Sequence, residues 1–272
     1  MIEDRLQVTR FELKYRISAA TALRMRDFLG SYLVLDQHGA GRPNNSYPIH
    51  NIYLDSDDLT IYWNVVNGSR NRYKIRLRYY DDHPASPVFF EIKRRVDNAI
   101  LKQRVPVRQE AVPWLLAGQL PAPEHLLSDP ANSLGTVQHF CQLMSGARAV
   151  PKVHLAYLRE AWVSDADDFV RVTLDREVCG GPHFSSAITT RIEGYVMPFE
   201  PLVILELKFS GRFPNWYNEL VQVFGVMQCG AAKYAESVVL LQEHRLNPAH
   251  IPFERADGVE KFLDRKSARH MI

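Results

Sequence analysis

The sequence has few cysteines and no long hydrophobic run. Its 272 residues include three cysteines, Cys141, Cys179 and Cys229, with no CxxC pair among them. This scarcity argues against a disulfide framework or a structural zinc site. No stretch of about 18 apolar residues occurs, and the first residues, MIEDRLQVTR, carry charge where a signal peptide needs an apolar segment. We therefore expect a cytoplasmic protein without a membrane span of its own.

Overall charge is also small, but its distribution is uneven. The formal net charge is +2, whereas residues 70–108 hold eleven Lys/Arg against four Asp/Glu, a local net charge of +7. Such a stretch is typical of a solvated basic face or of a site for a polyanion. The isoelectric point near 8.4 is modest, and no aromatic-rich segment interleaves the cations, so we do not expect nucleic acid as a partner.

The segment KIRLRYY, residues 74–80, places a cation at every second position. In a strand, Lys74, Arg76 and Arg78 share one face, and Ile75 and Leu77 take the other. Side chains two apart on a strand lie roughly 7 Å from each other, and at an effective dielectric of about 20 two cations at that distance repel by roughly 2 kcal/mol. This face therefore needs an anionic partner or open water.

Alternation of polar and apolar residues predicts several strands, separated by helical segments. We expect an α+β fold in which residues 1–272 form one domain, with a tail over 248–272 that is either a docking helix or a disordered end. The predicted strands cover 10–17, 51–56, 72–80, 88–96, 100–108, 152–163, 168–178 and 201–211. Helical patterns cover 19–30, 56–68, 111–118, 134–146, 215–226 and 231–244.

Two arrangements of these strands fit the pattern. A one-layer sheet with a solvated charged face is the simpler one. The other is a barrel whose interior is lined by cations and whose exterior is covered by helices. Cations recur at period two on several strands, and the opposite faces are strongly apolar, which favours the barrel. His154 falls on the predicted outer face, so we assign it no catalytic role.

Eight short motifs in a fixed order resemble a known family. The motifs are FELKY, YLDS, KIRLRYY, FFEIKRR followed by LKQR, YLREAW, VRVTLD, LELKF and AAKY. Together they resemble the polyphosphate-polymerase domain of the vacuolar transporter chaperone (VTC) family, a branch of the triphosphate tunnel metalloenzymes that also include CYTH-type triphosphatases. The resemblance implies an eight-stranded antiparallel β-barrel tunnel with a basic lumen. It also implies ATP or another triphosphate and polyphosphate as ligands, Mn²⁺ or Mg²⁺ as cofactor, and transfer of the γ-phosphate to a growing chain.

The resemblance also implies roles for particular residues. It predicts catalytic phosphate contacts from Lys14, Arg76, Arg78, Lys93, Arg159 and Lys208. Further substrate contacts are implied for Lys102, Arg104 and Lys233, and the alternation pattern adds Lys74, Tyr157 and Arg171 to the same face. The predicted metal ligand is Glu206, with Glu12 as a second ligand and Glu91 as an alternative. Arginine and lysine suit this chemistry because phosphoryl transfer depends on positioning and on neutralising phosphate charge.

Two departures from the family pattern bear on the function. Ala232 stands where the family often has Ser before the lysine, which removes one phosphate hydrogen bond. Arg10 stands in the first slot of the ExExK motif of the tunnel triphosphatases, which leaves only Glu12 and Lys14 and favours a polymerase. A triphosphate hydrolase and a non-enzymatic polyphosphate-binding domain remain the alternatives. A membrane channel that takes up the product would have to be a separate protein.

Overall fold

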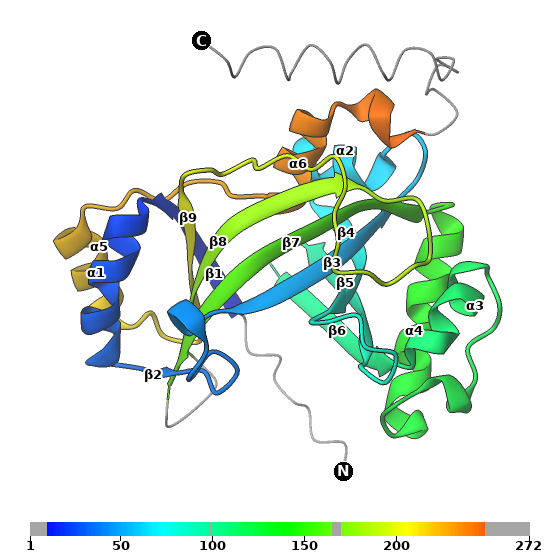
Figure 1. The fold of residues 1–272 in the computed structure, drawn as a ribbon, viewed down its shortest axis with the longest axis horizontal. Coiled ribbons are helices and arrows are strands. Elements are labelled where there is room, and N and C mark those ends of the chain that lie inside the picture. Colours follow the sequence, from blue (N-terminus) through cyan, green and yellow to red (C-terminus); the bar gives the residue numbers. More distant parts are fainter. Residues whose placement is uncertain (1–9, 98, 165–169, 248–272) are drawn as a thin grey trace, which may run out of the picture.

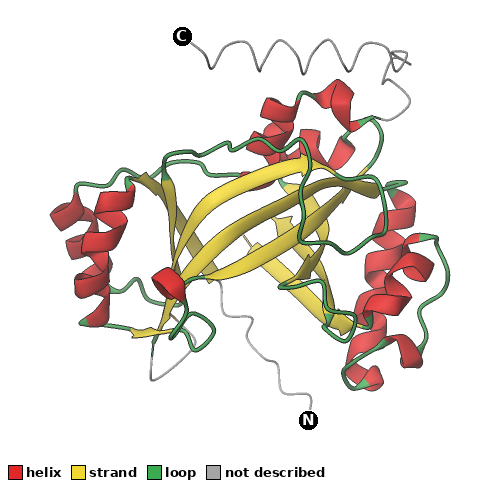
Figure 2. Cartoon of the chain, viewed as in Figure 1, coloured by secondary structure: helices red, strands yellow, loops and turns green. Residues whose placement is uncertain are grey.

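One antiparallel sheet organises the chain. The computed structural model describes residues 10–97, 99–164 and 170–247, and within them the sheet has the strand order β1-β9-β8-β7-β3-β4-β5-β6, with β2 paired to β7 (Figures 1 and 2). The strands are β1 Arg10–Ile17, β2 Val34–Leu35, β3 Tyr47–Asp55, β4 Asn71–Tyr79, β5 Val88–Val96, β6 Ala99–Val107, β7 Val150–Val163, β8 Val170–Pro182 and β9 Val203–Ser210. The expected α+β class is confirmed, and the predicted tail over 248–272 lies outside the described residues.

The sheet is strongly curved, but backbone pairing does not close it. In the described part of the chain, β1 and β6 end the hydrogen-bonded path and are not paired with each other, so the predicted closed barrel is not confirmed. The two ends still approach, because Lys93 Nζ on β5 lies 3.1 Å from Glu12 Oε2 on β1. The outer edge of β1 is covered by another segment, where the Cys229 amide donates to the Lys14 carbonyl oxygen at 2.9 Å.

Six α-helices accompany the described strands. They are α1 Ala19–Gly30, α2 Thr60–Val66, α3 Val112–Leu116, α4 Pro130–Gly146, α5 Asn215–Phe224 and α6 Lys233–Leu241. Ser18 caps α1 as predicted, because its Oγ accepts a hydrogen bond from the Thr21 amide. The second helix starts later than predicted, after Leu59 in a left-handed conformation (φ 55°). No helix of residues 10–97, 99–164 or 170–247 combines the length and apolar character needed to cross a membrane.

Two helical layers cover much of the convex face. Ile75 and Phe90 on β4 and β5 pack in one cluster with Phe140 of α4. At the other end of the sheet, Leu205 of β9 packs with Met25 of α1 and Tyr217 of α5. The apolar faces predicted from alternation therefore lie against helices, because these surfaces lose contact with water when the helices pack on them.

Helices were predicted to cover the outer face, and the last helix, α6, packs on the other face. A Cβ added to Gly180 would lie 2.6 Å from the Ser237 Oγ of α6, whereas one added to Gly181 would meet the Ile192 side chain of the β8–β9 connection. Successive residues of a strand face opposite ways, so α6 packs on the concave face and the connection crosses the convex face (Figure 1). His154, which is opposite Gly181 in the register, lies on this outer face as predicted.

Candidate functional site

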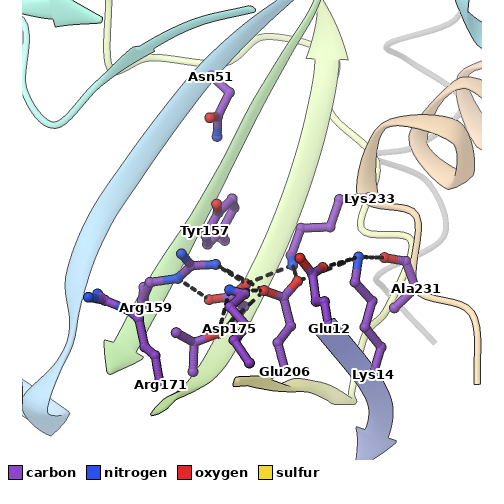
Figure 3. A network of polar contacts seen from close by, with 12 residues as sticks. Glu12, Lys14, Asn51, Tyr157, Arg159, Arg171, Asp175, Glu206, Ala231 and Lys233 are labelled. Atoms are coloured by element: carbon purple, nitrogen blue, oxygen red, sulfur yellow. Dashed lines mark hydrogen bonds and ion pairs between the residues drawn. The ribbon is translucent and has the colours of Figure 1, made fainter. Parts of the chain in front are cut away.

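The polar part of the concave face, here called the lumen, contains most of the predicted site residues. One group, the carboxylate cluster, consists of three acids and the four cations that surround them (Figure 3). Its members come from β1, β7, β8, β9 and the start of α6, and they are Glu12, Asp175, Glu206, Lys14, Arg159, Lys208 and Lys233. The pairing of these strands and the position of α6 therefore bring residues far apart in sequence to one place.

Glu206 is at the centre of the carboxylate cluster. It is 5% exposed, and its Oε1 lies 2.9 Å from Lys233 Nζ and 3.7 Å from Lys14 Nζ. Burial opposes its ionisation, but the charges of the surrounding cations, Lys208 first, outweigh burial and hold the pKa of Glu206 well below its usual range. The carboxylate is therefore ionised and fully engaged with cations in the ligand-free protein.

Asp175 holds the other side of this cluster. It accepts two hydrogen bonds from Arg159, both 2.7 Å long, and its Oδ2 lies 2.7 Å from Lys233 Nζ. Asp175 ends the motif VRVTLD, but no role was predicted for it. Its spacing of two and four residues from Thr173 and Arg171 was the signal that could have identified it.

A second group, the Glu91 cluster, lies on β4, β5 and β6. Glu91 is 1% exposed and is surrounded by four cations, Arg76, Arg78, Lys102 and Arg104, at distances from 2.6 to 3.7 Å. Burial disfavours the charged form of Glu91, but Arg76 and its neighbours outweigh burial, so its pKa lies well below the usual value. Four cations against one carboxylate leave this part of the lumen with surplus positive charge.

Neutral side chains orient the arginines of the second cluster. Arg76 Nη1 donates to the Tyr53 hydroxyl at 2.7 Å, and Arg78 Nε donates to Asn51 Oδ1 at 2.9 Å. Tyr157 accepts from Arg78 at 3.3 Å, and its ring lies beneath Arg159, whose guanidinium carbon is 5.2 Å from the ring centre. Tyr53 and Asn51 were missed by the sequence analysis, because neither residue type announces such a role.

Three further predicted residues differ in their surroundings. Lys93 pairs with Glu12. Lys74 has no carboxylate within ion-pair distance among the described residues, and burial lowers its pKa to about 8. Arg171 contacts neither cluster, since its guanidinium pairs with Asp36 at 2.7 Å and donates to the Tyr47 hydroxyl at 3.3 Å. The structure thus brings Lys74 and Lys93 to the lumen clusters and places Arg171 apart from them.

The expected repulsion along KIRLRYY is relieved inside the protein. Arg76 and Arg78 both approach Glu91 Oε2, at 2.6 and 3.7 Å. Opposite charges at such distances in a poorly hydrated site attract more strongly than two arginines about 7 Å apart repel. An external anion is therefore not required for the lumen to fold, although the surplus of cations still favours one.

The lumen carboxylates are suitable ligands for a hard cation. Glu12 and Glu206 both approach Lys14 Nζ, at 3.0 and 3.7 Å, so their oxygens face a shared position that already holds positive charge. Mg²⁺ and Mn²⁺ prefer oxygen ligands, and Mg²⁺ typically takes one or two carboxylates with substrate phosphates. No group of three or more His, Cys, Asp or Glu suited to a metal occurs in the described ranges. Glu12 and Glu206 therefore fit a cation whose remaining coordination positions are filled by substrate oxygens.

Comparisons with known proteins found similar sequences and structures. Vacuolar transporter chaperone complex subunit 4 of Schizosaccharomyces pombe is 26% identical over 206 residues, which cover 64% of this chain and 29% of that protein. The chain thus spans less than a third of that relative. Among solved structures, a Bacillus halodurans protein assigned as an adenylate cyclase has a TM-score of 0.48 at 12% identity, covering 82% of this chain and 94% of the other.

A Mimivirus capping enzyme triphosphatase has a TM-score of 0.34 at 12% identity, with 79% and 88% of the two chains covered. Likeness at these scores says nothing about the activity of this chain. The family model is more informative, because the VTC domain matches residues 9–242. With most of its 272 residues matched, the chain belongs to the VTC domain family.

Proposed function

We propose that this protein is a polyphosphate polymerase, which transfers the γ-phosphate of ATP to a growing polyphosphate chain in the lumen. The observation that carries the proposal is the convergence of cations from β1, β4, β5, β6, β7, β9 and α6 on one concave face. Membership of the VTC domain family and the similarity to a subunit of a vacuolar transporter chaperone complex support the same function.

Surplus charge in the Glu91 cluster suits a phosphate chain. Arg76 and Arg78 present planar guanidinium groups, and Lys102 presents a compact ammonium next to them. Guanidinium groups can bind two phosphate oxygens at once, and lysine acts as a point charge. Bound phosphates would compete with Glu91 for these groups, so the carboxylate keeps the cations in place until substrate arrives.

The transfer itself needs position and charge rather than a protein nucleophile. A terminal phosphate oxygen of the acceptor chain attacks the γ-phosphorus of ATP, and the bond from that phosphorus to the β-phosphate bridging oxygen breaks. ADP leaves, and the chain is longer by one phosphate. The lumen cations hold donor and acceptor in line and stabilise the charge on the transferred group. Lys14, Arg159, Lys208 and Lys233 lie closest to the carboxylates and are the residues that we assign to this step.

Glu206 and Glu12 would hold the divalent cation, which when bound neutralises charge on the phosphate oxygens. In the ligand-free protein these carboxylates engage Lys14, so the lysine and the cation compete for the same oxygens. Substitution Glu206→Gln keeps the shape of the side chain and removes its charge. We expect it to raise the Mn²⁺ concentration needed for half-maximal activity at least tenfold, with a smaller effect on triphosphate binding. Unchanged Mn²⁺ dependence would place the ligand elsewhere.

The decisive experiment is incubation with ATP and Mn²⁺, followed by gel separation of the phosphate-containing products and an assay for ADP. A ladder of long polyphosphate with matching ADP would support the polymerase. Orthophosphate without a ladder would identify a triphosphatase, and tight triphosphate binding without turnover would identify a binding domain. Arg76→Ala is the matched inactive variant, and Arg24→Ala, which removes an exposed arginine outside the lumen, is the control.

The relative is a subunit of a complex, so we further propose that a separate protein partner receives the product. We favour a membrane channel as this partner, because a polyanion needs a protein path across a bilayer.

A further inference from the structure

One end of the lumen carries arginines that neither cluster uses. Here the turn before β4 meets the turn that starts at Asp97 after β5, and a hollow of about 460 Å³ is lined by Gly68, Arg70, Arg72, Arg95 and Asp97. We call Arg70, Arg72 and Arg95 the arginine mouth. The Asp97 amide donates to the Arg70 carbonyl oxygen at 3.2 Å, so the backbone joins the two turns.

The arginine mouth lacks the internal carboxylates that the deeper lumen has. Arg72 donates to the Ser69 carbonyl oxygen, and Arg95 Nε donates to the Asp97 carbonyl oxygen at 2.8 Å. In the described part of the chain, none of the three arginines has a carboxylate within 4.0 Å. Burial and the nearby charge of Arg95 lower the pKa of Arg72, which agrees with two arginines that lie near each other and have no carboxylate in ion-pair contact among the described residues.

Register connects the mouth to the two clusters. Arg72 is opposite Arg95, the next pair on the same face is Lys74 and Lys93, and Arg76 with Glu91 follows. Cations therefore continue from the Glu91 cluster to the mouth without an apolar interruption on this face. A linear polyanion that occupied the lumen would find its next contacts at Lys74 and then at the arginines.

The opposite end of the same strands is chemically different. Phe89, which is opposite Arg78 in the register, lies beneath Arg104, with 3.6 Å between the guanidinium carbon and the ring centre. Tyr80 is near both Phe89 and Tyr47, with ring centres 6.0 and 6.3 Å apart. The lumen thus runs from an aromatic end to an arginine end.

We propose that the arginine mouth is a binding site for the part of a linear polyphosphate chain that extends beyond the triphosphate-binding lumen. This inference rests on the proposed function, and it assigns a direction: the longer chain leaves the lumen past Arg70, Arg72 and Arg95. The arginines act as a sequence of phosphate contacts that a triphosphate is too short to reach from the clusters.

The test compares tripolyphosphate with long-chain linear polyphosphate by titration calorimetry on the full chain. The mouth variant carries Arg70→Ala and Arg95→Gln, which leave Arg72 and the backbone hydrogen bond from Asp97 to Arg70 in place. The matched control carries Arg24→Ala and Arg94→Gln, because both are exposed and Arg94 adjoins Arg95 on the opposite face of β5. Both variants lose two positive charges.

We expect the mouth variant to bind long-chain polyphosphate about tenfold more weakly. Its affinity should also depend less steeply on salt, because binding with fewer phosphate contacts releases fewer counterions. Its affinity for tripolyphosphate should equal that of the unaltered protein. The control variant should bind both ligands with the affinities of the unaltered protein. Equal weakening for both ligands would overturn the proposal, and so would the same loss in the control. If the unaltered protein binds neither ligand, the proposed function fails as well. If it binds both but does not extend polyphosphate, only the polymerase fails, and the comparison still decides on the mouth.

Discussion

At the scale of single residues, the stability of the lumen depends on its acidic side chains as much as on its basic ones. Repulsion along KIRLRYY, taken alone, predicts that Arg76→Ala leaves the fold intact or makes it more stable. The structure removes the reason for that expectation, because Arg76 contacts both Glu91 and Tyr53. Its loss leaves a buried carboxylate with weaker compensation, so we now expect Arg76→Ala to lower the free energy of unfolding.

The substitution Glu91→Gln tests this balance directly. It leaves Arg76, Arg78, Lys102 and Arg104 without their shared carboxylate, so we expect the free energy of unfolding to fall by about 3 kcal/mol. Tripolyphosphate affinity should rise, because the ligand no longer competes with an internal anion. Urea unfolding with and without tripolyphosphate measures both effects, and Glu110→Gln at an exposed position is the control. Unchanged stability would show that Glu91 is not the anchor of the cluster.

At the scale of elements, the β8–β9 connection is held on the convex face by buried histidines. His154 Nε2 lies 3.0 Å from both His50 Nδ1 and the Tyr79 hydroxyl, and that hydroxyl donates to the Thr189 carbonyl oxygen at 2.7 Å. Burial lowers the pKa of His50 and, more strongly, the pKa of His154 to about 3. The folded protein therefore keeps these rings neutral where the unfolded chain protonates them.

This arrangement predicts acid sensitivity. The depressed histidine pKa values contribute stability above about 6.5, the pKa in an unfolded chain, and that stability is lost as the pH falls. We expect the free energy of unfolding to decrease between pH 7 and pH 5, and His154→Gln to reduce this decrease. Urea unfolding at the two pH values measures it, with the exposed His244→Gln as control. An identical pH dependence in His154→Gln and the unaltered protein would contradict the assignment.

At the scale of the whole molecule, lysines from different parts of the lumen have the same pH dependence. Burial lowers the pKa values of Lys74, Lys102 and Lys208 to about 8, against an ordinary value of 10.5. Between these values the unfolded chain binds more protons than the folded one, so the free energy of unfolding rises with pH. The affinity for phosphate changes with pH in the opposite direction, because binding requires the charged form of each lysine.

We therefore expect alkaline conditions to stabilise the ligand-free protein and to weaken the binding of phosphate ligands. From pH 7.5 to pH 9.5, the urea midpoint should increase and tripolyphosphate affinity should decrease. At pH 8.5, calorimetry in buffers of different ionisation enthalpy should show proton uptake on binding. Parallel changes in stability and affinity, or binding without proton uptake, would mean that these lysines do not lie in the phosphate site.

Much of the local structure was readable from the sequence. The strand at 88–96 was predicted with its observed bounds, and the alternation along 74–78 assigned Lys74, Arg76 and Arg78 to one face correctly. Period two is a property of the extended backbone itself, so it needs no tertiary information. The family resemblance, carried by eight ordered motifs, was confirmed by the family match.

The sequence by itself determined which faces are polar and which family the chain belongs to. Only the tertiary structure decided the partners within the lumen, because Asp175 meets Lys233 and Glu12 meets Lys93 across separations that no local pattern encodes. It also decided that α6 packs on the concave face and that β1 and β6 do not pair among the described residues. Curvature and register are set by the packing of all strands and helices together, and a pattern confined to one strand carries no information about either.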